Sequence, residues 1–283
     1  MKRELRRVAV IGAGTMGHGI AQVSAMAGFH TTLCDTAEER VRAGIDRVRA
    51  NLDEGVRRGK VDPDVRAATL DRIRGAVELA EAVADADLVI EAVPERLDLK
   101  LDVFRTLDAH APAGAVLATN TSSLSVTEIQ GGTARPDRVL GLHFFNPVHL
   151  MKLVEVVRGR QTAEETVEAA LAFVRRIDKE PIVVNDSPGF ASSRLGVALG
   201  LEAMRMVEEG VASAEAIDRA MELGYRHPMG PLRLTDLVGL DVRLDIARYL
   251  HETLGSERFR PPAILERLVA EGKLGRKTGQ GFY

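Results

Sequence analysis

The sequence predicts an α/β protein: a doubly wound, mostly parallel sheet with a helical arm, followed by a smaller all-helical domain. Three observations lead to this prediction. Short apolar runs alternate with helical segments as far as residue 184, as in a parallel sheet covered by helices. No run beyond residue 187 is typical of a strand. The length of 283 residues exceeds what one core usually organises, so we expect two domains, 1–186 and 187–283.

The first elements are a strand at residues 8–11, a glycine-rich turn, a helix and a second strand at 31–34 that ends at Asp35. The turn reads Gly12-Ala13-Gly14-Thr15-Met16-Gly17. This order is typical of a Rossmann-like dinucleotide-binding unit. Gly12 permits the tight turn, Gly14 lets the pyrophosphate approach the backbone, and Gly17 lets the helix pack closely. The start of that helix attracts phosphates.

Asp35 indicates which dinucleotide binds. Its carboxylate would accept hydrogen bonds from both ribose hydroxyls of NAD and would repel the 2′-phosphate of NADP. Thr36 and Ala37 supply no arginine for that phosphate, although Arg40 lies one helical turn further on. The alternative is that Asp35 only caps a helix. We expect NAD as the cofactor.

Residues 36–75 are a charged segment that a minimal nucleotide-binding fold lacks. Helices are predicted at 38–58 and 63–73, and apolar residues at helical spacing give the first of them one buried face. The pair is expected to project from the sheet as an arm. Positive charge gathers at its tip, at Arg57, Arg58 and Lys60. Such a run is either a solvated helix end or an anion site.

The strand pattern then resumes and completes the first domain. Strands are predicted at 86–93, 116–120, 139–145, 153–157 and 181–184, with helices at 97–107, 126–129 and 162–177. In the second domain Ser187 is a good N-cap and Pro188 suits a first helical position. Helices are predicted there at 188–209, 213–223, 231–253 and 261–271. Their apolar faces are sufficient for a subunit interface, so a homodimer through them is expected.

His143 and Glu155 are the main candidates for chemistry. His143 ends an apolar strand, at the edge where open α/β sheets place their sites, and Glu155 is flanked on both sides by apolar pairs. A poorly hydrated carboxylate needs a partner. If the two strands lie side by side, Glu155 reaches His143 and makes it a general base. The alternative is a histidine satisfied by a backbone carbonyl. Ser122 follows another strand and either bonds a reacting oxygen or caps a helix.

Composition excludes several other functions. A net charge of −3 gives no reason to expect nucleic acid or a membrane as a partner. The single cysteine, Cys34, excludes an intrachain disulfide, and lying in a predicted strand it is expected to be an inert buried thiol. The seven histidines show no close-spaced ligand pattern, so no metal is expected. The basic start leads into the first strand rather than a signal peptide. We expect a cytoplasmic protein.

Six ordered segments resemble the NAD-dependent 3-hydroxyacyl-CoA dehydrogenases, especially the short bacterial 3-hydroxybutyryl-CoA type. They are residues 12–17, 118–123 (Ala-Thr-Asn-Thr-Ser-Ser), 141–147 (Gly-Leu-His-Phe-Phe-Asn-Pro), 152–156, 228–231 (Pro-Met-Gly-Pro) and 275–283. The resemblance covers essentially the whole chain. It implies reversible oxidation of an (S)-3-hydroxyacyl-CoA to the 3-oxoacyl thioester.

The resemblance also implies roles for individual residues. His143 would take the hydroxyl proton, Glu155 would orient His143, and Ser122 would bond the substrate oxygen. Contacts to NAD are implied, besides the glycine turn, at Asp35, Glu95, Lys100, Asn146 and Lys277. The arm would hold coenzyme A through positions that match Asn51 and Arg58.

One position departs from the family pattern. Where the family usually has a substrate-contacting asparagine before an arginine, this chain has Ser193 before Arg194. Serine is shorter and lacks the second group of the amide, so the resemblance does not set the acyl-chain preference. Two other functions stay open: a dehydrogenase of a free 3-hydroxy acid or sugar acid, and a non-catalytic NAD-binding sensor.

Overall fold

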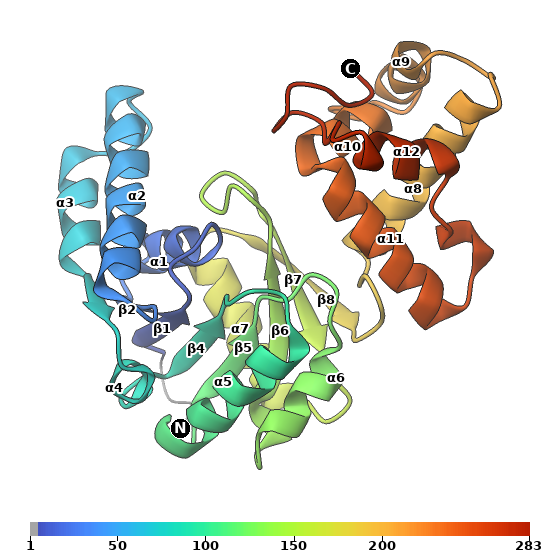
Figure 1. Ribbon diagram of the computed structural model, residues 1–283. Coiled ribbons are helices and arrows are strands. Elements are labelled where there is room, and N and C mark those ends of the chain that lie inside the picture. Colours follow the sequence, from blue (N-terminus) through green and yellow to red (C-terminus); the bar gives the residue numbers. More distant parts are fainter. Residues whose placement is uncertain (1–4) are drawn as a thin grey trace. The chain divides into compact units, whose positions relative to one another are not determined.

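The structure is a computed structural model that describes residues 5–283. It divides into two compact units, Met1–Ser187 and Pro188–Tyr283. The first unit contains a sheet with helices on both faces and a helical arm, and the second is built of helices (Figure 1). The predicted fold class is therefore confirmed.

The sheet determines where a ligand can bind. Within residues 5–187 its order is β3-β2-β1-β4-β5-β6-β7-β8, and every neighbouring pair is parallel except β6 with β7. The order reverses between β1 and β4, and in such sheets the ligand binds at the carboxyl ends of the strands at that point. The strands are β1 Arg7–Ile11, β2 His30–Cys34, β3 Ile73–Ala76, β4 Leu88–Glu91, β5 Val116–Thr119, β6 Val139–Phe144, β7 Leu153–Arg158 and β8 Glu180–Asn185.

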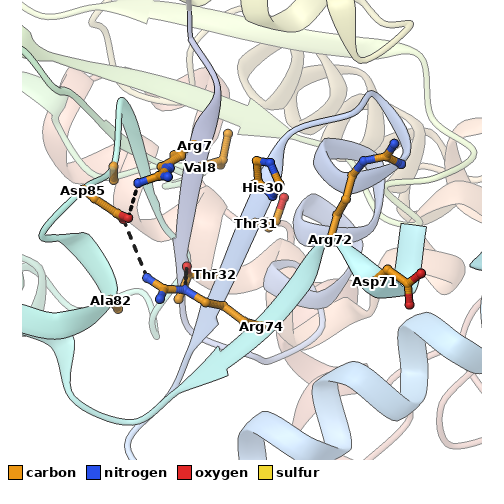
Figure 2. Close-up of a pocket in the computed structure, with 11 residues that line it drawn as sticks. Arg7, Val8, His30, Thr31, Thr32, Asp71, Arg72, Arg74, Ala82 and Asp85 are labelled. Carbon is orange, nitrogen blue, oxygen red and sulfur yellow. Dashed lines mark hydrogen bonds and ion pairs between the residues drawn. The ribbon is translucent and has the colours of Figure 1, made fainter. Parts of the chain in front are cut away.

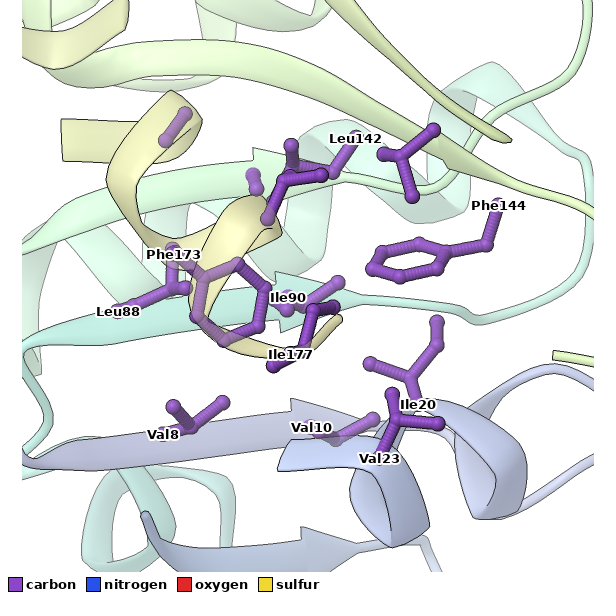
Figure 3. Close-up of a cluster of buried hydrophobic side chains, with 14 of the residues drawn as sticks. Val8, Val10, Ile20, Val23, Leu88, Ile90, Leu142, Phe144, Phe173 and Ile177 are labelled. Atoms are coloured by element: carbon purple, nitrogen blue, oxygen red, sulfur yellow. The ribbon is translucent and has the colours of Figure 1, made fainter. Parts of the chain in front are cut away.

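Helices cover both faces of this sheet, with α1 and α7 on one face and α5 on the other (Figure 1). A strand that is covered on both faces has a continuous run of apolar residues in its sequence. These strands could therefore be predicted from the sequence. Figure 3 shows part of the core between β1, β4, α1 and α7, including Val8, Val10, Ile20, Val23, Leu88, Ile90, Phe173 and Ile177. The helices of this unit are α1 Gly17–Met26, α2 Glu38–Arg57, α3 Pro63–Asp71, α4 Leu79–Val83, α5 Leu97–His110, α6 Val126–Ile129 and α7 Glu164–Arg176.

The arm consists of α2 and α3, which lie side by side (Figure 1). Asp62 caps α3 by accepting a hydrogen bond from the N–H of Asp64 at 2.8 Å, and Nε of Arg66 binds Oδ1 of Asp53 on α2 at 2.6 Å. The prediction that the second arm helix reaches residue 73 is wrong. The helix ends at Asp71, and the next residues form edge strand β3, which lacks an apolar run because it is largely uncovered.

The second unit contains α8 Ser192–Glu208, α9 Ala214–Gly224, α10 Pro231–Val238, α11 Leu240–Leu254 and α12 Ala263–Ala270. Two predictions here are wrong. The first helix does not begin at Pro188, because Gly189 and Phe190 have φ values of 74° and 48°, which a right-handed helix cannot contain. The helix predicted at 231–253 is two helices, because Gly239 with a φ of 107° interrupts it.

Gly230 and Tyr283 of the second unit serve its packing. Buried Asp218 accepts hydrogen bonds from the N–H of Leu232 at the start of α10 and from the hydroxyl of Tyr283, both at 2.8 Å. Asp236 accepts from the N–H of Tyr283 at 3.0 Å. A Cβ on Gly230 would overlap Asp218, so glycine is required beside this carboxylate. The end of the chain is therefore tied to α9 and α10.

Candidate active site

The glycine turn between β1 and α1 has room for a dinucleotide. Gly12 has a φ of 102°, and a Cβ on it would lie 2.6 Å from the carbonyl oxygen of Ala92. A Cβ on Gly17 would overlap the carbonyl oxygen of Gly12. Gly14 is exposed, and a Cβ there would meet no atom within 4 Å. Because no side chain caps the start of α1, this open turn and its backbone N–H groups fit a pyrophosphate.

Asp35 follows β2 and faces the same turn. Its Oδ2 accepts a hydrogen bond from the N–H of Ala13 at 2.8 Å, and its Oδ1 lies 3.7 Å from Nη1 of Arg40. Arg40 is thus next to a carboxylate that would repel a 2′-phosphate. Thr15 is exposed and Met16 is half-buried in the turn itself. These contacts fit the ribose of NAD.

His143 and Glu155 are directly opposite one another on the antiparallel strands β6 and β7. Nδ1 of His143 lies 2.7 Å from Oε2 of Glu155. Glu155 is fully buried and His143 is 6% exposed. In this geometry a proton on Nδ1 would be donated to the carboxylate, and Nε2 would be left to accept a proton from a substrate.

Ser122 lies in the loop after β5, and Glu95 holds that loop. One oxygen of this carboxylate accepts hydrogen bonds from the hydroxyl of Thr121 (2.5 Å) and from the N–H groups of Ser122 (2.9 Å) and Ser123 (3.1 Å). Burial alone would raise the pKa of Glu95, but the ammonium of Lys100 and the hydrogen bonds from the loop outweigh it and hold the pKa below its usual value. Ionised Glu95 therefore orients the backbone of Ser122.

Lys100 is buried rather than open to the cofactor site. Its Nζ lies 2.6 Å from Oε1 of Glu91 and 3.4 Å from Oε2 of Glu95. The other oxygen of Glu91 accepts a hydrogen bond from the hydroxyl of Thr119 at 2.7 Å. Lys100 is 1% exposed and Glu91 is fully buried. Lys100 thus holds two carboxylates in place, and its direct contact with NAD stays a prediction.

Glu91 was not singled out from the sequence. The available signal was an acid inside the apolar run 86–93, which needs a buried partner for the same reason as Glu155 does. The sequence also did not indicate a second connection. Oδ1 of Asn120 accepts a hydrogen bond from the N–H of Phe144 at 2.9 Å. This bond joins the loop that carries Ser122 to the end of the strand that carries the histidine.

Lys179 is a further residue that the sequence did not reveal. Its Nζ donates to the carbonyl oxygens of Val148 and Met151, each at 2.6 Å, and the side chain is buried. These two hydrogen bonds hold the loop after β6 in place. Asn146 lies in this loop and is exposed. A Cβ on Gly19 of α1 would lie 2.8 Å from Cβ of Val148, so the loop packs directly on the helix that follows the glycine turn.

A cavity of about 740 Å³ lies between the arm, α1 and the loop after β6. Asn51 and Arg58, the predicted coenzyme A contacts, both line it. Nδ2 of Asn51 binds Oε1 of Gln22 at 3.1 Å, and Arg58 is paired with Glu54 one turn before it on α2. The other basic side chains of the lining are Lys60, Lys152, Arg176 and Lys179. The excess of positive charge suits a polyphosphate ligand.

A smaller cavity, of about 250 Å³, lies at the opposite edge of the sheet (Figure 2). It is formed at the amino ends of β1 and β2, where Arg7 and Arg74 both approach Asp85. Because parallel sheets bind ligands at their carboxyl ends, this cavity is not part of the candidate site. Among residues 5–283 no cluster of three or more His, Cys, Asp or Glu side chains could hold a metal ion.

Three remaining expectations concern other positions. Cys34 is buried, and burial raises its pKa to about 11, so its thiol is unreactive. Ser193 and Lys277 belong to the second unit. Ser193 is half-buried on α8, and the ammonium of Lys277 lies 2.5 Å from Oδ2 of Asp241.

In the part of the chain that the structure describes, no helix is long and apolar enough to cross a membrane.

The chain is similar to known proteins over its whole length. Residues 7–187 match the family model described as 3-hydroxyacyl-CoA dehydrogenase, NAD binding domain, and residues 189–283 match its C-terminal domain. The chain is 45% identical over 280 residues to a probable 3-hydroxybutyryl-CoA dehydrogenase of Bacillus subtilis, covering 99% of this chain and 97% of the relative. It is 43% identical over 283 residues to a 3-hydroxybutyryl-CoA dehydrogenase of Bradyrhizobium diazoefficiens, covering 100% and 96%.

Solved structures are similar over the same length. The crystal structure of (S)-3-hydroxybutyryl-CoA dehydrogenase from Ralstonia eutropha matches with a TM-score of 0.95 and 40% identity, covering 99% of each chain.

Proposed function

Because this chain belongs to the 3-hydroxyacyl-CoA dehydrogenase family, an enzyme family with NAD as its cofactor, we propose that it oxidises short (S)-3-hydroxyacyl-CoA thioesters with His143 as the base. The observation that carries the proposal is the buried His143–Glu155 pair at the carboxyl edge of the sheet. The matching relatives act on 3-hydroxybutyryl-CoA by name, which supports a short acyl chain.

The proton leaves the substrate hydroxyl for Nε2 of His143. NAD, when bound, supplies the acceptor of the hydride from C3. The positive charge that develops on the imidazole is stabilised by Glu155, 2.7 Å away, in a setting with little water to screen it. Ser122, held by Glu95, donates a hydrogen bond to the substrate oxygen and keeps the carbinol aligned. In the reverse direction the imidazolium returns the proton to the 3-oxo oxygen.

Coenzyme A occupies the cavity beside the arm. Its phosphates need cations, and the lining supplies Arg58, Lys60 and Lys152. A dehydrogenase of a free hydroxy acid would have no use for this cavity, which favours the thioester over the alternative substrate. Ser193 and Lys277 are proposed contacts of the substrate and NAD from the second unit, and Lys100 acts through Glu95.

The test is a spectrophotometric assay of NADH formation. Purified protein supplied with NAD and (S)-3-hydroxybutyryl-CoA should produce NADH, whereas free (S)-3-hydroxybutyrate should react far more slowly. Equal rates with thioester and free acid would contradict the thioester proposal, and tight NAD binding without turnover on several chain lengths would contradict catalysis.

Arg58→Glu should raise KM for the acyl-CoA about 10-fold and leave KM for NAD unchanged. A charge-assisted hydrogen bond to phosphate contributes about 1.5–3 kcal/mol, and the exposure of Arg58 places the effect at the lower end. Steady-state kinetics with each substrate varied in turn measures both constants. Arg49→Glu is the matched control, because Arg49 pairs with Asp46 on the same helix but does not line the cavity. If both variants behave alike, Arg58 does not bind coenzyme A.

We also propose a homodimer formed through the second unit. Leu195 and Leu199 on α8 are 71% and 36% exposed and, being four residues apart, share one face of the helix. Two leucines at this spacing suit the same face of a second copy. A cytoplasmic location is proposed as well, supported by the single, buried, unpaired thiol of Cys34.

Leu195→Asp combined with Leu199→Asp should convert the dimer to a monomer, because burying two carboxylates against a second copy is unfavourable. Light scattering coupled to gel filtration gives the mass directly. Leu223→Asp, at a residue with 71% exposure on α9, is the control and should stay dimeric. A wild-type mass of one chain would contradict the dimer.

A further inference from the structure

Arg243 of α11 is a buried cation that lacks an anion. The residue is only 7% exposed, and its Nε has no hydrogen-bond partner among residues 5–283. Burial lowers the pKa of Arg243, and no neighbouring charge of the described chain counteracts that shift. A buried guanidinium without a partner is costly, so proteins pair such groups or use them to bind an anionic ligand.

The acids nearest in the sequence are already engaged. Asp241 binds the ammonium of Lys277, and Asp236 accepts hydrogen bonds from backbone N–H groups at the end of the chain. Asp245 follows on the same helix but is exposed. None of these three carboxylates therefore pairs with Arg243.

The guanidinium lies over Gly196 of α8. A Cβ built on Gly196 would be 3.6 Å from Nη1 of Arg243 and 4.0 Å from its Nη2, and it would meet no other atom within 4 Å. The absence of a side chain at this position thus lets the guanidinium approach α8 closely. Any side chain larger than alanine would fill the space into which the guanidinium projects.

Ser193 lies one helical turn before Gly196, and residues three apart share one face of a helix. On the proposed function, Ser193 contacts the substrate, so the guanidinium is about 4 to 5 Å further along the same face. An apolar acyl end placed there would leave the cation buried and unpaired. A carboxylate at the end of the acyl chain would satisfy it.

We propose that Arg243 forms a carboxylate subsite, so that this enzyme prefers 3-hydroxyacyl-CoA substrates whose acyl chain ends in a second carboxylate. The inference rests on the proposed function and narrows its substrate class. Leu199 lies three residues after Gly196, so the proposed dimer face adjoins the guanidinium, and a carboxylate from a second copy is the competing partner that the test below distinguishes.

The test compares two six-carbon substrates that differ only at the chain end, (S)-3-hydroxyadipyl-CoA and (S)-3-hydroxyhexanoyl-CoA. In the wild-type protein kcat/KM should be higher for the adipyl thioester by on the order of 100-fold, because a site built around a buried polar group rejects the analogue that leaves it unpaired. A wild-type preference for the hexanoyl thioester, or none, overturns the proposal without any variant.

Arg243→Met should invert the preference, because methionine fills the same volume without charge. Arg248→Met is the matched control on α11, where the arginine is exposed and bound to Glu266, and it should leave the ratio unchanged. An unchanged ratio in Arg243→Met, or a loss of the dimer instead of the preference, overturns the proposal. Failure of all thioesters, including 3-hydroxybutyryl-CoA, in the wild-type protein would instead refute the proposed function.

Discussion

His143→Ala is expected to lower kcat for 3-hydroxybutyryl-CoA oxidation by about 10²- to 10⁴-fold, the range that general-base catalysis contributes. The loss should be this large because, in the proposed mechanism, His143 alone accepts the hydroxyl proton. NAD affinity should be unchanged, since the turn that binds the dinucleotide belongs to β1 and α1 rather than to β6. Stopped-flow kinetics gives the chemical rate, and calorimetry gives the affinity for NAD.

Two further variants test whether the loss of kcat in His143→Ala is specific to His143 and its pair with Glu155. His110→Ala removes an exposed histidine at the end of α5 and should leave kcat unchanged. Glu155→Gln keeps the size of the side chain but removes the charge that stabilises the imidazolium, so its kcat should fall between those of the wild type and His143→Ala. If His143→Ala retains wild-type turnover, the base is another group and the Glu155 pair is only structural.

The contact between His143 and Glu155 could be predicted because both of its signals are local. An acid between apolar residues requires a partner, and two short strands separated by seven residues can lie side by side. In the structure the register of β6 and β7 places Glu155 opposite His143. Gly12 and Asp35 were predictable for the same reason, since the turn and the strand end are close in the sequence.

What the sequence did not reveal depends on distant contacts. Strand β3 exists because β2 offers an edge to pair with, and its own residues carry little apolar pattern. The late start of α8 depends on the φ values of Gly189 and Phe190, which local propensity does not contain. The burial of Lys100 between Glu91 and Glu95 depends on how α5 packs on β4, and its contact with NAD stays a prediction.

Lys100→Met should destabilise the first unit by about 3–5 kcal/mol, the usual result of removing one partner of a buried ion pair. Glu91 is fully buried and would lose the ammonium that lies 2.6 Å away. Glu95 would lose the same cation, so the loop that carries Ser122 should loosen and kcat should fall together with stability. Urea unfolding followed by circular dichroism measures the first effect, and steady-state kinetics measures the second.

The double variant separates the two roles of Lys100. Adding Glu91→Gln to Lys100→Met removes the uncompensated charge and should recover much of the lost stability, whereas kcat should stay low because Glu95 still lacks its cation. Arg105→Met is the control on the same helix, where the pair with Asp102 is exposed and its loss should cost at most about 1 kcal/mol. If Lys100→Met is as stable as Arg105→Met, the buried pair does not support the fold. If kcat recovers along with stability, Lys100 acts through the fold and not through the Ser122 loop.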